Sequence, residues 1–174
     1  MHLRERLMDY SLGNHLRLYW RLFRLREQAG NSLLTDILTF LLNRIAHKRG
    51  GYIGRGANIA DIPSLPHGLH GIYISRYASI GRGCRIYQNV TIGEVNGRAP
   101  QIGDNCLIGA NAVLVGDIRI GSGARIGAGA AVSFDVPPNA TVVAQPPRVS
   151  VREPAVPQKD RPESKRSLRT KSFF

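Results

Sequence analysis

Residues 102–132 read IGDNCLIGANAVLVGDIRIGSGARIGAGAAV, and an aliphatic residue returns in this stretch every six positions. The six anchors are Ile102, Ile108, Leu114, Ile120, Ile126 and Val132. A helix would repeat apolar residues about every 3.6 positions and an ordinary strand about every two. A six-residue period is instead typical of a parallel β-helix, in which short strands stack coil upon coil. The stretch therefore predicts a solenoid.

The same period extends towards the N-terminus. It includes Ile74, Ile80, Ile86 and Ile92, and it is already present at Ile53, Ile59 and Leu65. A second position, four residues after each anchor, is also small or branched: Ala78, Cys84, Val90, Cys106, Ala112, Ile118, Ala124, Ala130 and Val136. From Ile53 to Val132 the pattern amounts to about four coils of three strands each. We therefore expect a mainly β fold.

Two insertions interrupt the rhythm, one around His67–Gly71 and one around Glu94–Arg98. Interruptions of a regular solenoid form loops on one face, which is often the binding face. Because these two flank the same coil, they can meet, and we look for chemistry there.

The flanks of the solenoid differ from it in composition. Residues 14–28 and 32–47 place apolar residues at helical spacing, which predicts two helices that cap the open end of the solenoid. A basic amphipathic helix on a membrane surface is the alternative. We expect a helical cap over residues 1–50, a β-helix domain over 51–149 and a basic, flexible tail over 150–174, which is rich in Pro, Ser and charge.

The net charge of +12 is divided as +5 in residues 1–49, +3 in 50–149 and +4 in 150–174. The basic residues are not interleaved with aromatics in a recognisable motif, so we expect no nucleic-acid partner. Anionic ligands or peripheral contact with a membrane through the N-terminal helix fit the charge better. Charged residues interrupt the first segment, so it is no signal peptide, and we expect a cytoplasmic protein.

The chain has two cysteines, Cys84 and Cys106, both at the small inward position of their repeats. We expect them to stack on neighbouring coils as reduced core residues rather than to act as nucleophiles.

Only two of the five histidines, His67 and His70, lie in the repeat region. Imidazole titrates near neutral pH and can accept a proton from a hydroxyl group as an acyl group is transferred. A metal site would need a third ligand, and none is in register, so we expect no metal. Glycines at the corners leave backbone amides that can hold a phosphate or an oxyanion.

The motifs L-x-H at 65–67, V-T-I-G at 90–93, I-G-A-x-A at 108–112, I-G-A-G-A at 126–130 and D-V-P-P at 135–138 recur in order in a known family. The chain resembles the hexapeptide-repeat acyltransferases over residues 53–149. Within them it is most similar to the serine acetyltransferase branch, including short forms found with exopolysaccharide and capsule genes. The resemblance implies a left-handed β-helix, a homotrimer, and acetyl-CoA bound along the groove between neighbouring subunits.

The resemblance also implies roles for individual residues. His67 matches the catalytic base, and His70 is the weaker candidate. Gly93 matches the glycine near the thioester, while Glu94 and Arg98 belong to the substrate loop. Two further pairs of residues are expected to contact acetyl-CoA. Ala110 and Ala128 would contact the pantetheine arm, and Arg125 and Arg148 would lie near the nucleotide.

Three departures bear on the acceptor. Pro66 stands where serine acetyltransferases have an Asp before the catalytic His, and Ala99 stands where their loop has a second His. The tail ends in Phe, whereas the sulfhydrylase-binding tail of the family ends in Ile, so we expect no sulfhydrylase complex. These departures favour an acetyl-CoA-dependent O-acetyltransferase acting on a sugar of a surface polysaccharide or its precursor. Serine is the alternative acceptor, and a non-enzymatic module that binds glycans or membranes or a metal-dependent hydratase are the alternatives of other classes.

Overall fold

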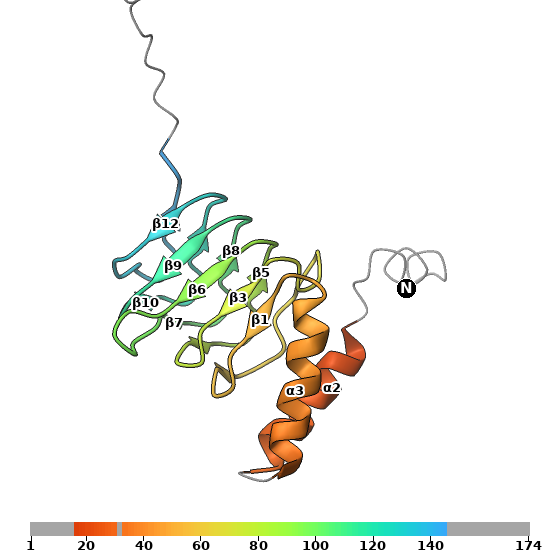
Figure 1. Cartoon of the computed structure of the whole chain (residues 1–174). Helices are drawn as coiled ribbons and strands as arrows, with labels where there is room; N and C mark the ends of the chain where they lie inside the picture. The colour runs from red at the N-terminus through yellow and green to blue at the C-terminus, as the bar shows by residue number, and fades with distance from the viewer. Residues whose placement is uncertain (1–15, 31–32, 146–174) are drawn as a thin grey trace, which may run out of the picture.

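The chain folds as a parallel β-helix with two helices at one end, as Figure 1 shows for a computed structural model that describes residues 16–30 and 33–145. The helices are α2 (Arg17–Gln28) and α3 (Leu33–His47). The strands are β1 (Tyr52–Ile53), β2 (Asn58–Ile59), β3 (Tyr73–Ile74), β4 (Ser79–Ile80), β5 (Arg85–Ile86), β6 (Thr91–Gly93), β7 (Gln101–Ile102), β8 (Leu107–Ile108), β9 (Val113–Val115), β10 (Arg119–Ile120), β11 (Arg125–Ile126), β12 (Ala131–Val132) and β13 (Thr141–Val142).

The strands stack into three parallel sheets. Sheet A has the order β1-β3-β6-β9-β12, sheet B has β10-β7-β4-β2 and sheet C has β13-β11-β8-β5. Ser64 extends sheet C by a parallel bridge to Arg85. The chain passes from A to B to C and back to A, so each coil has three corners, which we call the A–B, B–C and C–A corners. The predicted solenoid of about four coils is confirmed.

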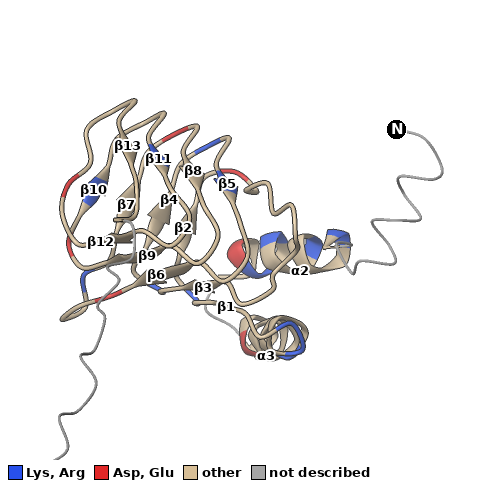
Figure 2. Ribbon diagram, turned by 90° about the horizontal axis from the view of Figure 1, so that it is seen from above, with Lys and Arg blue, Asp and Glu red and all other residues tan. Residues whose placement is uncertain are grey.

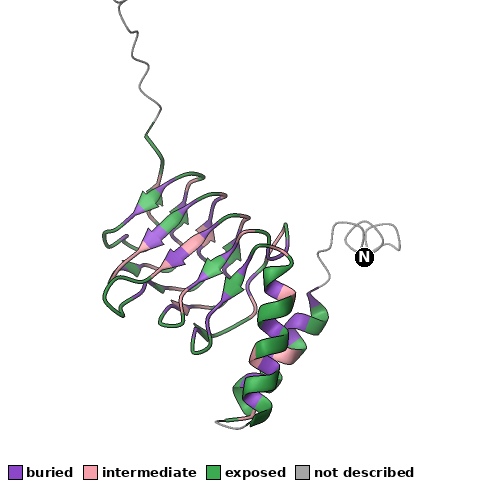
Figure 3. Cartoon of the chain, viewed as in Figure 1, coloured by how far each residue is buried: buried purple, intermediate pink, exposed green. Residues whose placement is uncertain are grey.

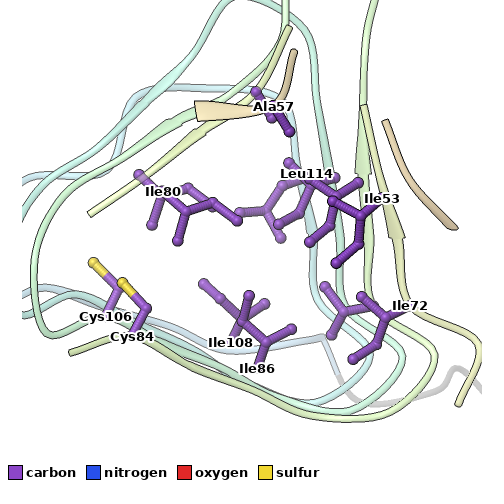
Figure 4. Packing of buried hydrophobic residues seen from close by; sticks show 14 of the residues in the cluster. Ile53, Ala57, Ile72, Ile80, Cys84, Ile86, Cys106, Ile108 and Leu114 are labelled. Atoms are coloured by element: carbon purple, nitrogen blue, oxygen red, sulfur yellow. The ribbon is translucent and has the colours of Figure 1, made fainter. Parts of the chain in front are cut away.

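The core lies inside the coils, where the anchors of successive coils stack (Figure 4). All ten anchors from Ile74 to Val132 are buried, and so is every residue of the second inward position from Ala78 to Val136. Registers such as Ile74 to Ile92 and Ile92 to Leu114 keep each anchor directly above its equivalent. Each coil therefore buries its apolar side only against its neighbours, which explains why the six-residue period must be so regular.

Helices α2 and α3 cap the β1 end of the solenoid (Figure 1). Tyr19, Trp20 and Phe23 of α2 join the same core cluster as the coils, with edge-to-face ring contacts of 5.3 and 5.4 Å between consecutive centroids. Burial raises the pKa of Tyr19 to about 12. The aromatic side of α2 thus packs against the solenoid.

Only part of the apolar surface of the helices is used in this packing (Figure 3). Leu38 and Leu42 of α3 are buried, whereas Leu33 is 76% exposed and Phe40 65% exposed. On α2, Leu18 is 62% exposed. Neither described helix is both long and apolar enough to cross a membrane.

Two expectations fall outside the described residues. They concern the tail over 150–174 and the cofactor contact at Arg148.

Candidate active site

The first insertion forms the C–A corner of the first coil. Ser64 pairs with sheet C, and the chain returns to sheet A at β3. His67 and His70 lie on the segment between them. Both histidines are exposed, whereas Leu69 and Ile72 from the same segment are fully buried. The buried residues tie the insertion to the core, so the imidazoles stand on an anchored turn rather than on a free loop.

His67 lies beside the next coil of the same corner. Its ring is 6.0 Å from the ring of Tyr87, centroid to centroid, and the two planes are tilted by 50°. Gln88 follows Tyr87 directly in the chain and belongs to the same corner. Gln88 Oε1 is buried and, within the described part of the chain, has no hydrogen-bond partner. The corner thus combines the exposed imidazole of His67 with the side-chain amide oxygen of Gln88, which accepts no hydrogen bond within the described residues.

The C–A corners of successive coils are joined by backbone hydrogen bonds. The amide of Asn89 donates to His70 O at 2.9 Å, that of Asn111 to Gln88 O at 3.1 Å and that of Gly129 to Ala110 O at 2.8 Å. The side chain of Asn89 also donates to Asn111 Oδ1 at 3.2 Å. These bonds make one continuous column.

The column contains both alanines expected to contact acetyl-CoA. Ala110 lies in the turn between β8 and β9, and Ala128 lies in the turn between β11 and β12. Both turns lead from sheet C to sheet A, as the His67 segment does. The structure therefore brings His67, Ala110 and Ala128 to the same edge of the solenoid.

The second insertion is a hairpin at the A–B corner between β6 and β7. Val95 and Arg98 form an antiparallel bridge, with backbone N–H to O distances of 2.8 and 3.1 Å. Asn96 and Gly97 between them both have positive φ, 52° and 75°, as a type I′ turn requires. An Asn-Gly pair is a strong signal for this turn, so the hairpin could have been read from the sequence.

Side-chain interactions hold the hairpin to the neighbouring coils. Ser75 Oγ donates to Glu94 Oε2 at 2.5 Å, and Arg98 forms a 2.6 Å ion pair with Asp117. A hollow of about 650 Å³ lies between the hairpin and the segment from Val115 to Ile118. Glu94 and Arg98, expected in the substrate loop, are thus engaged with the scaffold of their own chain.

The expectation that the two insertions can meet is wrong for a single chain. His67 lies at the C–A corner, whereas Glu94 and Arg98 lie at the A–B corner, with sheet A between them. The physical reason is that each coil turns three times, so an insertion after a sheet C position and one after a sheet A position occupy different edges. Gly93, at the end of β6, lies on the hairpin side, and Arg125 is exposed on sheet C.

The outward face of sheet A separates these two corners and carries no charge at its paired positions. The residues in register along it are Tyr52, Tyr73, Thr91, Val113 and Ala131. The corresponding column of sheet C includes Arg85 and Arg125. Tyr73 is 47% exposed, which leaves much of its ring available for contact.

Cys84 and Cys106 occupy the third corner, B–C, and point inward (Figure 4). Their thiols donate to the carbonyls of Gly103 and Gly121, each at 3.2 Å. Contact with the thiol of Cys106 and burial both raise the pKa of Cys84. The expectation of two free, stacked core cysteines is confirmed.

Among residues 16–30 and 33–145, no three His, Cys, Asp or Glu side chains gather as ligands of a metal would.

Comparison with known proteins connects this geometry with one family. The model of the bacterial transferase hexapeptide (six repeats) family matches residues 99–133. The chain is 39% identical over 107 residues to a serine acetyltransferase of Synechococcus elongatus, covering 59% of this chain and 43% of that protein. It is 34% identical over 141 residues to serine acetyltransferase 2 of Arabidopsis thaliana, covering 78% of this chain and 43% of that protein.

Solved structures agree with these relatives. A serine acetyltransferase of Neisseria gonorrhoeae superposes with a TM-score of 0.65 at 34% identity, over 80% of this chain and 56% of that one. A soybean serine acetyltransferase complexed with serine superposes with a TM-score of 0.66 at 34% identity, over 75% of this chain and 55% of that one.

The six-residue repeat, the three parallel sheets and the matched family model together identify a hexapeptide-repeat β-helix. Over this region the chain is similar to serine acetyltransferases. It spans less than half the length of the curated relatives named above.

Proposed function

We propose that this protein is an acetyl-CoA-dependent O-acetyltransferase. The observation that carries the proposal is the C–A edge, where an exposed His67 shares with the small residues Ala110 and Ala128 a corner that backbone hydrogen bonds join from coil to coil. Small side chains at that edge leave room for a long, thin ligand beside the backbone. The similarity to serine acetyltransferases supplies the class of reaction.

In this proposal His67 is the general base. Its imidazole accepts the proton of the acceptor hydroxyl while the hydroxyl oxygen attacks the thioester carbonyl of acetyl-CoA. The new C–O bond forms, the C–S bond breaks, and the thiolate of coenzyme A takes up a proton as it leaves. Cys84 and Cys106 are buried on another corner, which supports direct transfer without an acyl-enzyme.

The active site lies between two neighbouring chains of a homotrimer. One chain supplies the C–A edge with His67, and the next supplies the A–B edge with Gly93 and the hairpin. Two observations support this arrangement: sheet A separates the edges within one chain, and its paired outward positions are uncharged, as the centre of an interface tends to be. An amide near Gly93 would then face the developing oxyanion from across the interface.

Serine is the first acceptor to test, because the relatives and solved structures are serine acetyltransferases and the soybean enzyme was solved with serine. A sugar hydroxyl is the second candidate. Pro66 precedes the base and offers no carboxylate, and Ala99, after the hairpin, is 5% exposed and offers no polar side chain. A serine ammonium or carboxylate would therefore lack two of the partners that the resemblance implies.

The deciding assay measures the release of free thiol from acetyl-CoA, with serine and a panel of sugars and nucleotide sugars in parallel. Turnover with serine alone would assign the acceptor to serine, and turnover with a sugar alone would assign it to the glycan class. A protein that binds acetyl-CoA but releases thiol with none of the acceptors would contradict the proposed transfer.

Mixed trimers test the shared site. A His67→Ala chain and a chain with a disrupted hairpin, Gly93→Trp, are each expected to be inactive alone. When the two are co-expressed, some interfaces combine two intact edges, so part of the activity returns. If mixtures stay as inactive as the parents although they assemble, both edges must act within one chain, and the trimeric site is wrong.

A further inference from the structure

A groove lies between α2 and the first coil. Its helix side is formed by Leu16, Arg17, Trp20, Arg21 and Arg24, and its solenoid side by Ile62, Pro63 and Leu65. Its volume is about 450 Å³. Small-molecule sites in proteins usually measure about 300–1,000 Å³, so the groove has room for a small organic ligand.

Three arginines line one wall of this groove. Arg17, Arg21 and Arg24 are spaced four and three residues apart, which puts them on one side of the helix. All three are exposed, and no carboxylate of the described residues pairs with any of them. The blue segments of α2 in Figure 2 show this concentration of positive charge. Like charges at such spacing repel, so an anion bound between them would stabilise the helix.

The surroundings leave the positive charge unneutralised. The one acid next to the solenoid wall, Asp61, accepts a hydrogen bond from the amide of Ile62 at 2.8 Å. On α2, Glu27 pairs with the buried Arg26 at 2.9 Å instead of with the three exposed arginines. Arg26 also stacks on Phe23, 4.6 Å from the ring centroid, so it belongs to the packed side of the helix.

The floor of the groove is apolar. Trp20 is 7% exposed, Pro63 is buried, and Ile62 and Leu65 are half-buried. A guanidinium wall binds a phosphate through charge-assisted, bidentate hydrogen bonds, and an apolar floor favours an aliphatic or flat group beside it. We propose that this groove is a binding site for a small organic phosphate that carries an apolar group.

The proposal concerns a soluble ligand rather than a membrane surface. The arginines face a concave pocket with the solenoid wall opposite, whereas a helix that lies on a bilayer presents a free convex face. The site differs from the proposed acetyl-transfer site in its functional groups, since its three arginines are on α2 and neither His67 nor the hairpin lines it; only Leu65 comes from the segment that carries His67.

Trp20 is the single tryptophan of the chain and lines the groove, so its fluorescence reports on binding there. The full-length protein is titrated with octyl phosphate below its micelle concentration. We expect a saturable change in fluorescence that weakens as salt is added. Inorganic phosphate lacks the apolar chain, and octyl glucoside lacks the charged phosphate. Each should therefore bind at least about tenfold more weakly than octyl phosphate.

Two triple variants separate the groove from general charge. Arg17→Gln, Arg21→Gln and Arg24→Gln together should weaken octyl phosphate binding by at least about tenfold. The matched control, Arg82→Gln, Arg85→Gln and Arg119→Gln, removes the same charge from exposed positions of the solenoid and should bind as the parent does. Circular dichroism melts verify that both variants fold, and the single variant Arg21→Glu provides the same test with a smaller change.

Three results would overturn the proposal. They are an unsaturable response to octyl phosphate, an equal loss of binding in both triple variants, and flotation with phosphatidylglycerol vesicles without a saturable response to the soluble ligand. The last result would assign the arginines to a membrane surface instead.

Discussion

The C–A and A–B corners lie at opposite ends of the strands of sheet A, yet they are held by different interactions. The C–A corner is held by backbone hydrogen bonds from coil to coil, and its turns stack Gly71, Asn89 and Asn111 above one another. The A–B corner carries a hairpin held by side chains, through Ser75–Glu94 and Arg98–Asp117. The first is a rigid edge suited to positioning a base and a ligand, and the second is a loop that can change without disturbing the stack.

The largest difference between the corners should be chemical. His67→Ala removes the proposed base and should lower acetyl transfer by about 10²–10⁴-fold, while the exposed position leaves the melting temperature unchanged. Steady-state thiol release measures the effect. His70→Ala, three residues away on the same turn, is the matched control and should keep most of the activity. If His70→Ala lost more acetyl transfer than His67→Ala, the base would be His70.

The backbone of the C–A corner should be nearly as sensitive, but in stability. Gly71 has a φ of 65°, and a Cβ there would overlap Asn89 Oδ1 and lie 3.1 Å from Asn89 Cα. Gly71→Ala should therefore lower the free energy of unfolding by about 2–3 kcal/mol, from left-handed strain together with the clash. Urea denaturation followed by circular dichroism measures the loss.

Gly97 in the hairpin provides the comparison. Its φ is 75°, but a Cβ there would meet nothing within 4 Å. Gly97→Ala should thus lower the free energy of unfolding by only about 1 kcal/mol, which is the left-handed strain alone. Equal losses at Gly71 and Gly97 would show that stacking on Asn89 adds nothing to the C–A corner.

The ion pair at the A–B corner should matter least for stability. Arg98 and Asp117 are both more than half exposed. Arg98→Ala should change the free energy of unfolding by less than about 1 kcal/mol, because exposed pairs are screened by water and salt. The same denaturation assay applies, with Asp117→Ala as the partner variant. A larger loss would mean that the hairpin is part of the cooperative structure.

Much of this contrast could be predicted from the sequence. The anchors from Ile74 to Val132 predict the solenoid because each coil can bury its apolar side only if the period is kept. His67 and the hairpin were recognisable as insertions for the same reason. Their separation could not be predicted, because the corner that an insertion occupies depends on how many turns of the coil precede it. The three residues beyond the six-residue period between Leu65 and Ile74 leave the number of turns undefined.

Other features had no periodic signal. Leu33 and Ile37 follow a helical pattern that predicts burial, yet they are exposed, since only one side of α3 meets the coil. Within the described residues Gln88 Oε1 is buried without a hydrogen-bond partner, and no sequence period marks that position. The left-handed Asn89 and Asn111 were readable in principle, because asparagine tolerates positive φ better than most residues.

The helices α2 and α3 cover the β1 end of the solenoid, and within the described residues no helix covers the β12 end. In a structure whose coils touch only their neighbours, the coils that also pack against helices open last. Amide hydrogens should therefore exchange with solvent in a gradient, fastest in β12 and β13 and slowest in the coils next to the helices. The solenoid would then unwind from one end, and the edge that carries His67 would be the last part of the C–A column to lose its order.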